Sequence, residues 1–286
     1  MTSLWRGRPV GIVGLGLIGG SLGLDLRARG VDVHALVHRP ATAKRALERA
    51  LATRVDTDPA VLQDCGLIVL ALPLDRLLEP EPALRMALPA EAVITDVGSV
   101  KQPVLERWGP WHPRFVASHP MAGTAQAGVE AGVSGLFAGR PWVATPTPET
   151  DPEALAAVRE LAEAVGAEWL QCDASAHDRA VALISHMPVL VSAALLQAAG
   201  RGGAEADTAA LVRRLASSGF ADTSRIGGGN PELGTLMARC NREAVLEAVA
   251  LYRRQLESLE TLVREEQWPV LQHELSECQT LRPQFL

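Results

Sequence analysis

Short apolar runs alternate with helix-like segments through the first half of the chain. Runs rich in valine, isoleucine and leucine are typical of buried strands, and the segments between them repeat apolar residues every three to four positions. The predicted strands are Val10–Val13, Val33–Val37, Leu67–Leu72, Ala92–Thr95, Phe115–Ala117 and Trp142–Ala144. Helices are predicted between them, for example at Leu17–Arg29 and Ala41–Leu51. This alternation indicates a parallel sheet covered by helices.

The pattern changes near residue 173. A helix over Glu153–Val165 and a strand over Glu168–Leu170 are expected to complete the sheet, and the remaining chain is predicted to be nearly all helical. The predicted fold is therefore α/β: a Rossmann-like, doubly wound, mostly parallel sheet over residues 1–172, followed by an all-α domain over residues 173–286.

Two segments of the predicted helical domain are apolar enough that we expect them to be buried. The most apolar stretch, Ala180–Leu196, is shorter than a membrane span and includes polar residues, so we expect a buried helix. A later segment carries one apolar stripe at alternating steps of four and three residues: Val245, Val249, Tyr252, Leu256, Leu259 and Val263. Such a stripe is expected to be buried, either within the chain or against a second copy, and the period does not distinguish the two.

Composition and charge narrow the class of protein. The 286 residues are enough for two domains, and 48% hydrophobic with 21% charged residues is typical of a folded soluble protein. A net charge of −6 gives no general attraction for nucleic acid or anionic membranes. Because residues 1–9 lack a signal-peptide core, we expect a cytoplasmic protein. The four cysteines have no zinc-site spacing, so we expect reduced thiols and no metal site.

A glycine fingerprint follows the first predicted strand and opens the first helix. Gly14, Gly16 and Gly19 form a GxGxxG motif. The first glycine permits a tight turn, the second lets the backbone approach a pyrophosphate, and the third lets helix and strand pack closely. Unpaired amides at the helix start, including those of Leu17 and Ile18, are expected to face the phosphates. The motif predicts a dinucleotide site.

The end of the second strand indicates which dinucleotide. NAD sites usually carry an acidic residue there, which binds the adenosine ribose, whereas this chain has His38 and Arg39 followed by Thr42. Arg39 is placed to pair with the 2′-phosphate of NADP, with help from His38, Thr42, Lys44 or Arg45. We therefore predict NADP as the cofactor. A solvated Arg39 with relaxed cofactor choice is the alternative.

Two further motifs, Asp96–Lys101 (DVGSVK) and Ser118–Gly123 (SHPMAG), come after predicted strands. The carboxyl ends of parallel strands are where ligands collect in this architecture. His119 is suited to act as a general base near neutral pH, and Ser99 to hydrogen bond beside it. Asp96 and Lys101 either shape their turn or touch the cofactor.

Taken together, the motifs resemble those of prephenate/arogenate dehydrogenases, and the chain is most similar to the NADP-using arogenate dehydrogenases of the cyanobacterial type. The resemblance rests on GLGLIGGS, DVGSVK and SHPMAG, on His177–Asp178, on Ser185–Pro188 (SHMP), on the Ala216–Arg225 segment ending in DTSR, and on Gly227–Gly234 (GGGNPELG). It implies oxidative decarboxylation of arogenate to tyrosine with hydride transfer to NADP, in a homodimer built through the helical domain.

The resemblance also implies residue roles. His119 accepts the proton of the ring hydroxyl, and Ser99 hydrogen bonds the same hydroxyl. His186 and Arg225 bind substrate, Arg225 through a carboxylate. Asp178 and Asp222 are expected to hold these two groups in place. His186 also fits a buried histidine bonded to a kinked backbone, and Asp222 also fits a helix cap.

At one position that bears on the choice of substrate, this sequence differs from the pattern of the family. Several prephenate-using relatives carry an acidic residue shortly after the SHPxAG motif, where this chain has Ala125. The absence of a charge there fits the arogenate branch but leaves the substrate ammonium group without an obvious partner. Prephenate, giving 4-hydroxyphenylpyruvate, is the alternative substrate.

Two other classes of protein share part of this sequence pattern. A β-hydroxyacid dehydrogenase shares the glycine-rich start but relies on a lysine in its helical part, and residues 173–286 contain none. A noncatalytic NADP-binding redox sensor would not need Ser99, His119, His186 and Arg225 together. Both are less consistent with the sequence than a dehydrogenase.

Overall fold

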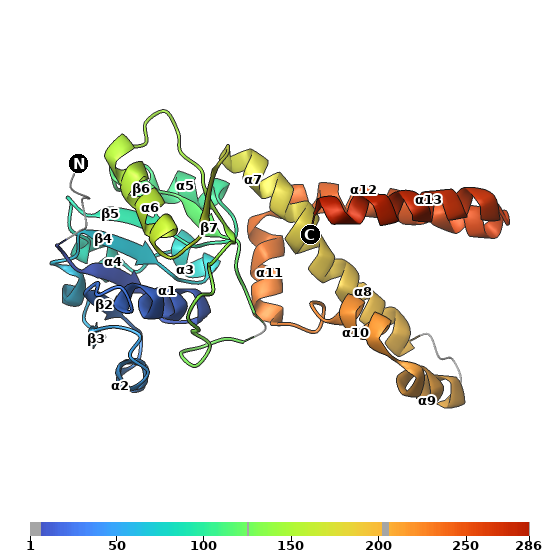
Figure 1. The fold of residues 1–286 in the computed structure, drawn as a ribbon, viewed down its shortest axis with the longest axis horizontal. Coiled ribbons are helices and arrows are strands. Elements are labelled where there is room, and N and C mark those ends of the chain that lie inside the picture. The colour runs from blue at the N-terminus through green and yellow to red at the C-terminus, as the bar shows by residue number, and fades with distance from the viewer. Residues whose placement is uncertain (1–6, 125, 202–205, 286) are drawn as a thin grey trace.

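The computed structural model describes residues 7–124, 126–201 and 206–285. An α/β domain forms one end of the molecule and a helical domain the other, and the chain passes between them at α7 (Figure 1). The predicted fold class is confirmed.

A six-stranded parallel sheet forms the centre of the first domain, in the order β3-β2-β1-β4-β5-β6. Its strands are β1 (Val10–Val13), β2 (Val33–Leu36), β3 (Arg54–Asp56), β4 (Leu67–Leu70), β5 (Val93–Asp96) and β6 (Phe115–Val116). The strand order reverses between β1 and β4, and ligands bind beyond the carboxyl ends of strands at such a point. β3 was not predicted, because this edge strand is only three residues long and partly exposed.

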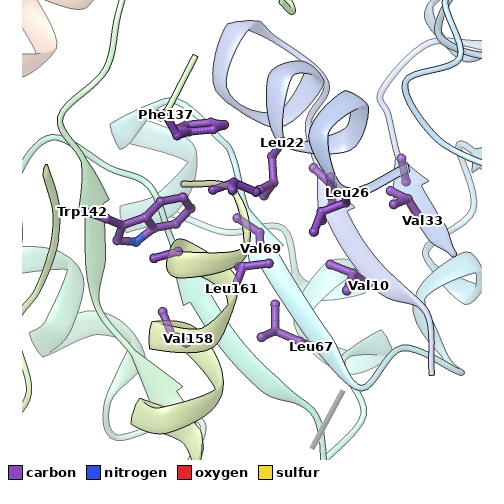
Figure 2. Close-up of a cluster of buried hydrophobic side chains, with 14 of the residues drawn as sticks. Val10, Leu22, Leu26, Val33, Leu67, Val69, Phe137, Trp142, Val158 and Leu161 are labelled. Atoms are coloured by element: carbon purple, nitrogen blue, oxygen red, sulfur yellow. The ribbon is translucent and has the colours of Figure 1, made fainter. Parts of the chain in front are cut away.

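Helices cover both faces of this sheet. They are α1 (Leu17–Arg27), α2 (Pro40–Glu48), the 3₁₀ helix η1 (Pro59–Leu62), α3 (Leu74–Leu78), α4 (Pro82–Ala87), α5 (Gln102–Trp108) and α6 (Pro152–Ala164). Alternate strand residues point to opposite faces and into separate cores. Leu67 and Val69 pack with Leu22 and Leu161, from α1 and α6, on one face (Figure 2).

A second, three-stranded sheet carries part of the predicted site. Its strands are β7 (Ser118–Pro120), β8 (Pro141–Ala144) and β9 (Glu168–Gln171), with β7 antiparallel and β9 parallel to β8. The expectation that the last two strands complete the main sheet was therefore wrong. His119 lies on β7, paired with Val143, rather than in a loop. The chain leaves the main sheet after β6 because β7 pairs with β8 instead.

The helical domain extends away from the sheet (Figure 1). Its elements are α7 (Ala174–Val181), the π-helical segment η2 (Ala182–His186), α8 (Met187–Arg201), α9 (Ala206–Leu215), α10 (Ser218–Ser224), α11 (Pro231–Cys240), α12 (Arg242–Arg264), α13 (Trp268–Leu281) and the 3₁₀ helix η3 (Arg282–Gln284). It packs on the first domain through α7 against α5 and α11 against α3, and Leu236 of α11 joins the core under the sheet.

The apolar helix predicted at Ala180–Leu196 is less buried than expected. It belongs to a continuous helical run, Ala174–Arg201, that is long and apolar enough to cross a membrane by length and composition. Only 22% of its most apolar window is buried within the chain. Within η2 only Ala182 and His186 are buried, whereas Leu183 and Ile184 are exposed, and most of α8 is not buried either. The expectation of a buried helix is therefore wrong for most of this stretch.

The apolar stripe of α12 is buried only at its start. Val245 is buried within the chain, whereas Leu256 and Val263 are about half exposed, at 52% and 50%. Trp268 and Leu275 on the neighbouring helix α13 are exposed to a similar degree. This distribution favours a second copy of the chain, rather than the intrachain core, as the cover for most of the stripe.

Candidate active site

The turn between β1 and α1 has the shape that a pyrophosphate requires. Gly14 has a φ of +94°, and a Cβ there would lie 2.4 Å from the carbonyl oxygen of Ala71. A Cβ at Gly19 would lie 2.0 Å from the carbonyl oxygen of Gly14. At Gly16, by contrast, a Cβ would have no described atom within 4 Å. Gly14 and Gly19 are therefore needed for packing, while Gly16 leaves open space above the turn.

The start of α1 provides the hydrogen-bond donors for this space. Gly16 precedes the helix, and no side chain of the described residues caps it. Gly20 donates to the carbonyl of Gly16, so the amides of Leu17, Ile18 and Gly19 precede the first intrahelical bond. Free amides at the positive end of a helix dipole suit an anion. These residues fit a dinucleotide pyrophosphate.

Directly after β2, a histidine and an arginine side chain face solvent. His38 and Arg39 are exposed, and neither side chain has a partner among the described residues. Arg45, one turn further along α2, is occupied instead: its Nη2 donates to Oε2 of Glu130 at 3.0 Å. Arg49 lies 3.7 Å from the same carboxylate. Arg39 is thus free for a phosphate, whereas Arg45 is engaged by Glu130.

Glu130 belongs to a segment, residues 130–135, that packs against α1. The backbone amide of Val133 donates to Ser21 Oγ at 3.0 Å, and that of Gly135 donates to Asp25 Oδ1 at 2.9 Å. Arg49 also donates to the carbonyl of Gly132 at 2.8 Å. The segment after SHPMAG is therefore fixed against the helix that carries the dinucleotide motif.

A buried ion pair shapes the turn after β5. Lys101 Nζ donates to the Asp96 carboxylate and, at 2.7 Å, to the carbonyl oxygen of Ser118. Asp96 also accepts from the amides of Gly98 and Ser118, at 2.8 and 3.1 Å. Burial lowers the pKa of Lys101 and raises that of Asp96, while their mutual attraction opposes both shifts. Of the two roles left open by the sequence, these contacts support shaping the turn.

His119 lies at one end of a chain of hydrogen bonds. Its Nδ1 is 3.0 Å from Nε2 of His177, and Nδ1 of His177 is 2.8 Å from Oδ1 of Asp178. The Asp178 carboxylate also accepts from the backbone amides of Lys101 and Gln102, at 2.7 and 2.9 Å. Residues of α7 therefore contact both β7 and the start of α5 and fix the boundary between the two domains.

The surroundings keep His119 neutral. Burial, followed by the nearby His177, Lys101 and His186, lowers the pKa of His119 well below the usual imidazole value of 6.5. A neutral imidazole is the form that accepts a proton. Ser99 is half-buried on the turn between β5 and α5, and its hydroxyl has no hydrogen-bond partner among the described residues. The structure thus places the His119 imidazole and the unengaged hydroxyl of Ser99 on neighbouring segments.

His186 lies at the end of the π-helical segment. Met187 donates to the carbonyl of Ala182, five residues back, and Pro188 has no amide to continue an α-helical pattern. Asn241 Nδ2 donates to the carbonyl of Asp178 at 2.8 Å and lies 3.2 Å from His186 Nδ1. The Nε2 of His186 is buried with no partner among the described residues. A donor to Nδ1 leaves Nε2 carrying the proton, so Nε2 is placed to donate to a ligand.

Arg225 is remote from these histidines. It follows α10, which packs on α8 away from β7 (Figure 1). Ser192 of α8 holds this turn: its Oγ donates to the carbonyl of Thr223 and accepts from the amide of Gly227, both at 2.8 Å. Arg225 and Asp222 are both exposed, and within the described part of the chain they form no ion pair. The sequence-based idea that Asp222 holds Arg225 through an ion pair is therefore not seen.

The predicted residues thus fall into two groups. His119, His186 and Asp178 are joined by hydrogen bonds through His177 and Asn241, whereas Asp222 lies on the distant helix α10 and Arg225 directly follows it. Sequence reasoning noted His177 only as part of a motif and missed Asn241. The sequence positions of His177 and Asn241 form no periodic pattern with the other site residues, because tertiary packing alone brings these two side chains to the site.

The open pyrophosphate cradle and the neutral histidine at the boundary of the next domain define a dehydrogenase that uses a nicotinamide dinucleotide. Two domain families match the chain. The prephenate dehydrogenase nucleotide-binding domain matches residues 22–171, and the prephenate dehydrogenase dimerization domain matches residues 173–277. The chain belongs to the prephenate dehydrogenase family, and the match of its helical half to the dimerization domain agrees with the exposed apolar helices.

Individual relatives agree with this assignment. The crystal structure of Synechocystis arogenate dehydrogenase is 42% identical, covers 97% of this chain and all of that one, and has a TM-score of 0.81. Prephenate dehydrogenase from A. aeolicus, solved in complex with hydroxyphenyl propionate and NAD+, is 27% identical with 98% of each chain covered and a TM-score of 0.90. Prephenate dehydrogenase from Bacillus subtilis is 28% identical over 262 residues, which is 89% of this chain and 70% of that protein.

Proposed function

We propose that this protein oxidises and decarboxylates L-arogenate to L-tyrosine with NADP as the hydride acceptor. The proposal depends above all on one observation: His119 is held neutral by its surroundings and bonded through Nδ1 to His177, which leaves Nε2 to accept a proton. A base of this kind beside a dinucleotide site is suited to alcohol oxidation.

The proposed reaction assigns proton transfer, substrate binding and cofactor binding to different residues. His119 Nε2 takes the proton of the ring hydroxyl, and Ser99 hydrogen bonds the same oxygen. When bound at Gly14, Gly16 and Gly19, NADP supplies the nicotinamide that accepts hydride from the hydroxyl-bearing carbon. The ring carboxylate then leaves as carbon dioxide, its bonding electrons complete the aromatic ring, and His119 returns the proton to the phenolate oxygen. The His186 Nε2–H, which has no partner among the described residues, donates to the substrate.

Arg225 is assigned to the substrate carboxylate, in the active site of the second copy of the chain. It follows α10, which lies away from β7 (Figure 1), and this supports an intersubunit role, since the helical half matches a dimerization domain. The bonds of Ser192 to Thr223 and Gly227 fix the backbone on both sides of this arginine against α8. A guanidinium binds a carboxylate through two parallel hydrogen bonds.

The preference for NADP rests on the charges at the end of β2. His38 and Arg39 stand where NAD enzymes usually carry an acidic residue, and the Arg39 guanidinium is unpaired among the described residues. Thr42 and Lys44 lie within the next turn of α2. A phosphate bonded by Arg39 contributes about 1.5–3 kcal/mol, which corresponds to roughly 10- to 100-fold in affinity.

The preference for arogenate rests on the 42% identity to Synechocystis arogenate dehydrogenase. Prephenate is the second candidate, since the B. subtilis and A. aeolicus relatives carry that name. Position 125, where the sequence has alanine in place of the expected charge, lies outside the described residues.

One assay tests both preferences. Purified protein is incubated with arogenate or prephenate, each with NADP or NAD, and reduction of the cofactor is followed at 340 nm. The highest kcat/KM is expected for arogenate with NADP, and tyrosine should form in equal amount. A higher kcat/KM with prephenate or NAD would overturn that part of the proposal, and no reduction in any combination would overturn it as a whole.

A further inference from the structure

We propose that His177 is a positioning residue for the reaction: it fixes the tautomer of His119 and shares the proton that His119 receives. This inference rests on the proposed role of His119 as the base. The observation behind it is a continuous row of hydrogen-bonding atoms from Asp178 through His177 to His119, which crosses from the helical domain to the α/β domain.

The hydrogen bonds of the Asp178 carboxylate determine the tautomer of His177, which in turn determines that of His119. Asp178 is an acceptor, because its oxygens receive the backbone amides of Lys101 and Gln102 as well as Nδ1 of His177. His177 therefore carries its proton on Nδ1, and its Nε2 has a free lone pair. That lone pair accepts from Nδ1–H of His119 across 3.0 Å. His119 is left with an unprotonated Nε2, which is the form a base requires.

Geometry holds this arrangement in place. The rings of His119 and His177 are 5.2 Å apart at 74°, so Nδ1 of one points to the edge of the other rather than to its face. His177 is only 3% exposed, and both of its ring nitrogens are engaged in hydrogen bonds. The Asp178 carboxylate lies at the start of α5, where its amide partners are fixed by the helix. Asp178 and His177 are thereby restrained from both sides, and His119 through its Nδ1.

The row also stabilises the proton after transfer. When the substrate hydroxyl proton binds Nε2 of His119, the ring becomes a cation whose Nδ1–H points at His177. A proton can then pass from His119 Nδ1 to His177 Nε2, and the Asp178 carboxylate, which stays ionised, stabilises the positive charge on His177. The other charged or titratable groups facing this row are Lys101 and His186, and neither bonds to the two rings in the described structure.

The first test reads the tautomers directly. The protein is labelled with ¹⁵N-histidine, and two-bond couplings show which ring nitrogen carries the proton, with His119 assigned by its loss in His119→Asn. The proposal expects the Nδ1–H tautomer at His119 in the natural sequence. In His177→Ala that preference should fall to a mixture, and His273→Gln, an exposed change on α13, serves as the control. A His119 ring in the Nε2–H form would overturn the proposal.

The second test separates orientation from proton sharing. A glutamine at 177 offers an oxygen where Nε2 stood, so His177→Gln should keep the His119 tautomer but lose proton transfer. We expect kcat to fall about tenfold in His177→Gln and about 100-fold in His177→Ala, with smaller changes in the KM for substrate. NADP affinity, measured by quenching of tryptophan fluorescence, should stay within twofold. A His177→Ala enzyme with kcat within twofold of the original would contradict the proposal.

The two tests also distinguish this inference from the proposed function. If no combination of substrate and cofactor is turned over, the function is wrong, yet the labelled spectrum still reports whether His177 sets the tautomer. If turnover is normal and the tautomer is Nε2–H, the function stands and the role of His177 fails. Should His177→Ala fold poorly, the spectrum of the natural sequence and the His177→Gln kinetics still decide.

Discussion

Lys101 and Asp96 form an ion pair in which neither side chain has exposed surface. The same lysine donates to the carbonyl oxygen of Ser118 at 2.7 Å, so the turn that carries Ser99 and the strand that carries His119 share one buried charge. The pair therefore supports the relative position of the proposed base and its neighbouring hydroxyl.

Removing one partner of this pair should destabilise the fold strongly. Lys101→Met leaves the Asp96 carboxylate buried without its cation, and such a loss costs about 3–5 kcal/mol of unfolding free energy. Denaturation in urea measures this. Arg242→Ala, which breaks the exposed pair with Glu243, is the control and should change stability by no more than about 1 kcal/mol. A loss in Lys101→Met as small as in the control would refute the argument.

His119→Asn removes the proposed base without much change in shape. Turnover should fall by about 10²- to 10⁴-fold while NADP still binds, because the dinucleotide contacts lie on the β1–α1 turn. In the natural sequence the pKa of His119 lies well below 6.5, so kcat/KM should stay level as the pH falls to 6.5 and decline only at lower pH. A decline centred at or above 6.5, or near-normal turnover in His119→Asn, would argue against this assignment.

Arg39→Ala tests the cofactor preference. Loss of the unpaired guanidinium should raise the KM for NADP by roughly 10- to 100-fold and leave that for NAD nearly unchanged. Arg45→Ala is a matched control, because Arg45 is already bonded to Glu130. Steady-state kinetics with both cofactors give the ratio, and equal effects of the two substitutions would remove Arg39 from the phosphate site.

A mixed dimer tests whether Arg225 acts across the interface. His119→Asn and Arg225→Ala homodimers should both be nearly inactive, the second because a desolvated carboxylate loses about 2–5 kcal/mol of binding. If the arginine serves the partner's site, a heterodimer of the two variants contains one intact site. Such a heterodimer, purified through two different tags, should recover about half of the original activity per dimer. An inactive heterodimer would place both residues in one chain's site.

The stability of the fold should depend on pH through His186. Burial lowers its pKa to about 4, from a usual 6.5. The unfolded chain therefore binds a proton between these values when the folded one does not, so stability is greatest above pH 6.5 and falls as the pH drops towards 4. The effect is about 3 kcal/mol. Urea unfolding between pH 4 and 7 should give a flatter curve for His186→Gln, and parallel curves would contradict the prediction.

Local pattern was enough to predict most of the α/β domain. Val10–Val13 was predicted to the residue, because an apolar run bounded by a glycine turn specifies both ends. The glycine roles also followed from sequence, since a positive φ at Gly14 and close packing at Gly19 depend on neighbours within a few positions. Helix ends differed by a few residues, as at α1, where caps rather than hydrophobic period set the boundary.

The sequence did not predict the features that depend on contacts between residues far apart in the chain. Ser118–Pro120 forms a strand only because it pairs with Pro141–Ala144, more than twenty residues later. His177 reaches His119 across 58 positions, and Asn241 reaches His186 across 55. No spacing rule links such residues, and the sequence therefore pointed to His119 and His186 but not to the residues that they contact.

The half-exposed leucines and valines along α12 and α13 have a consequence for the protein in solution. If a second chain both covers these side chains and supplies the carboxylate-binding arginine, dilution removes hydrophobic stabilisation and catalytic competence in the same step. Specific activity would then fall with enzyme concentration, and the dissociation constant of the dimer would set the lowest concentration at which the enzyme works.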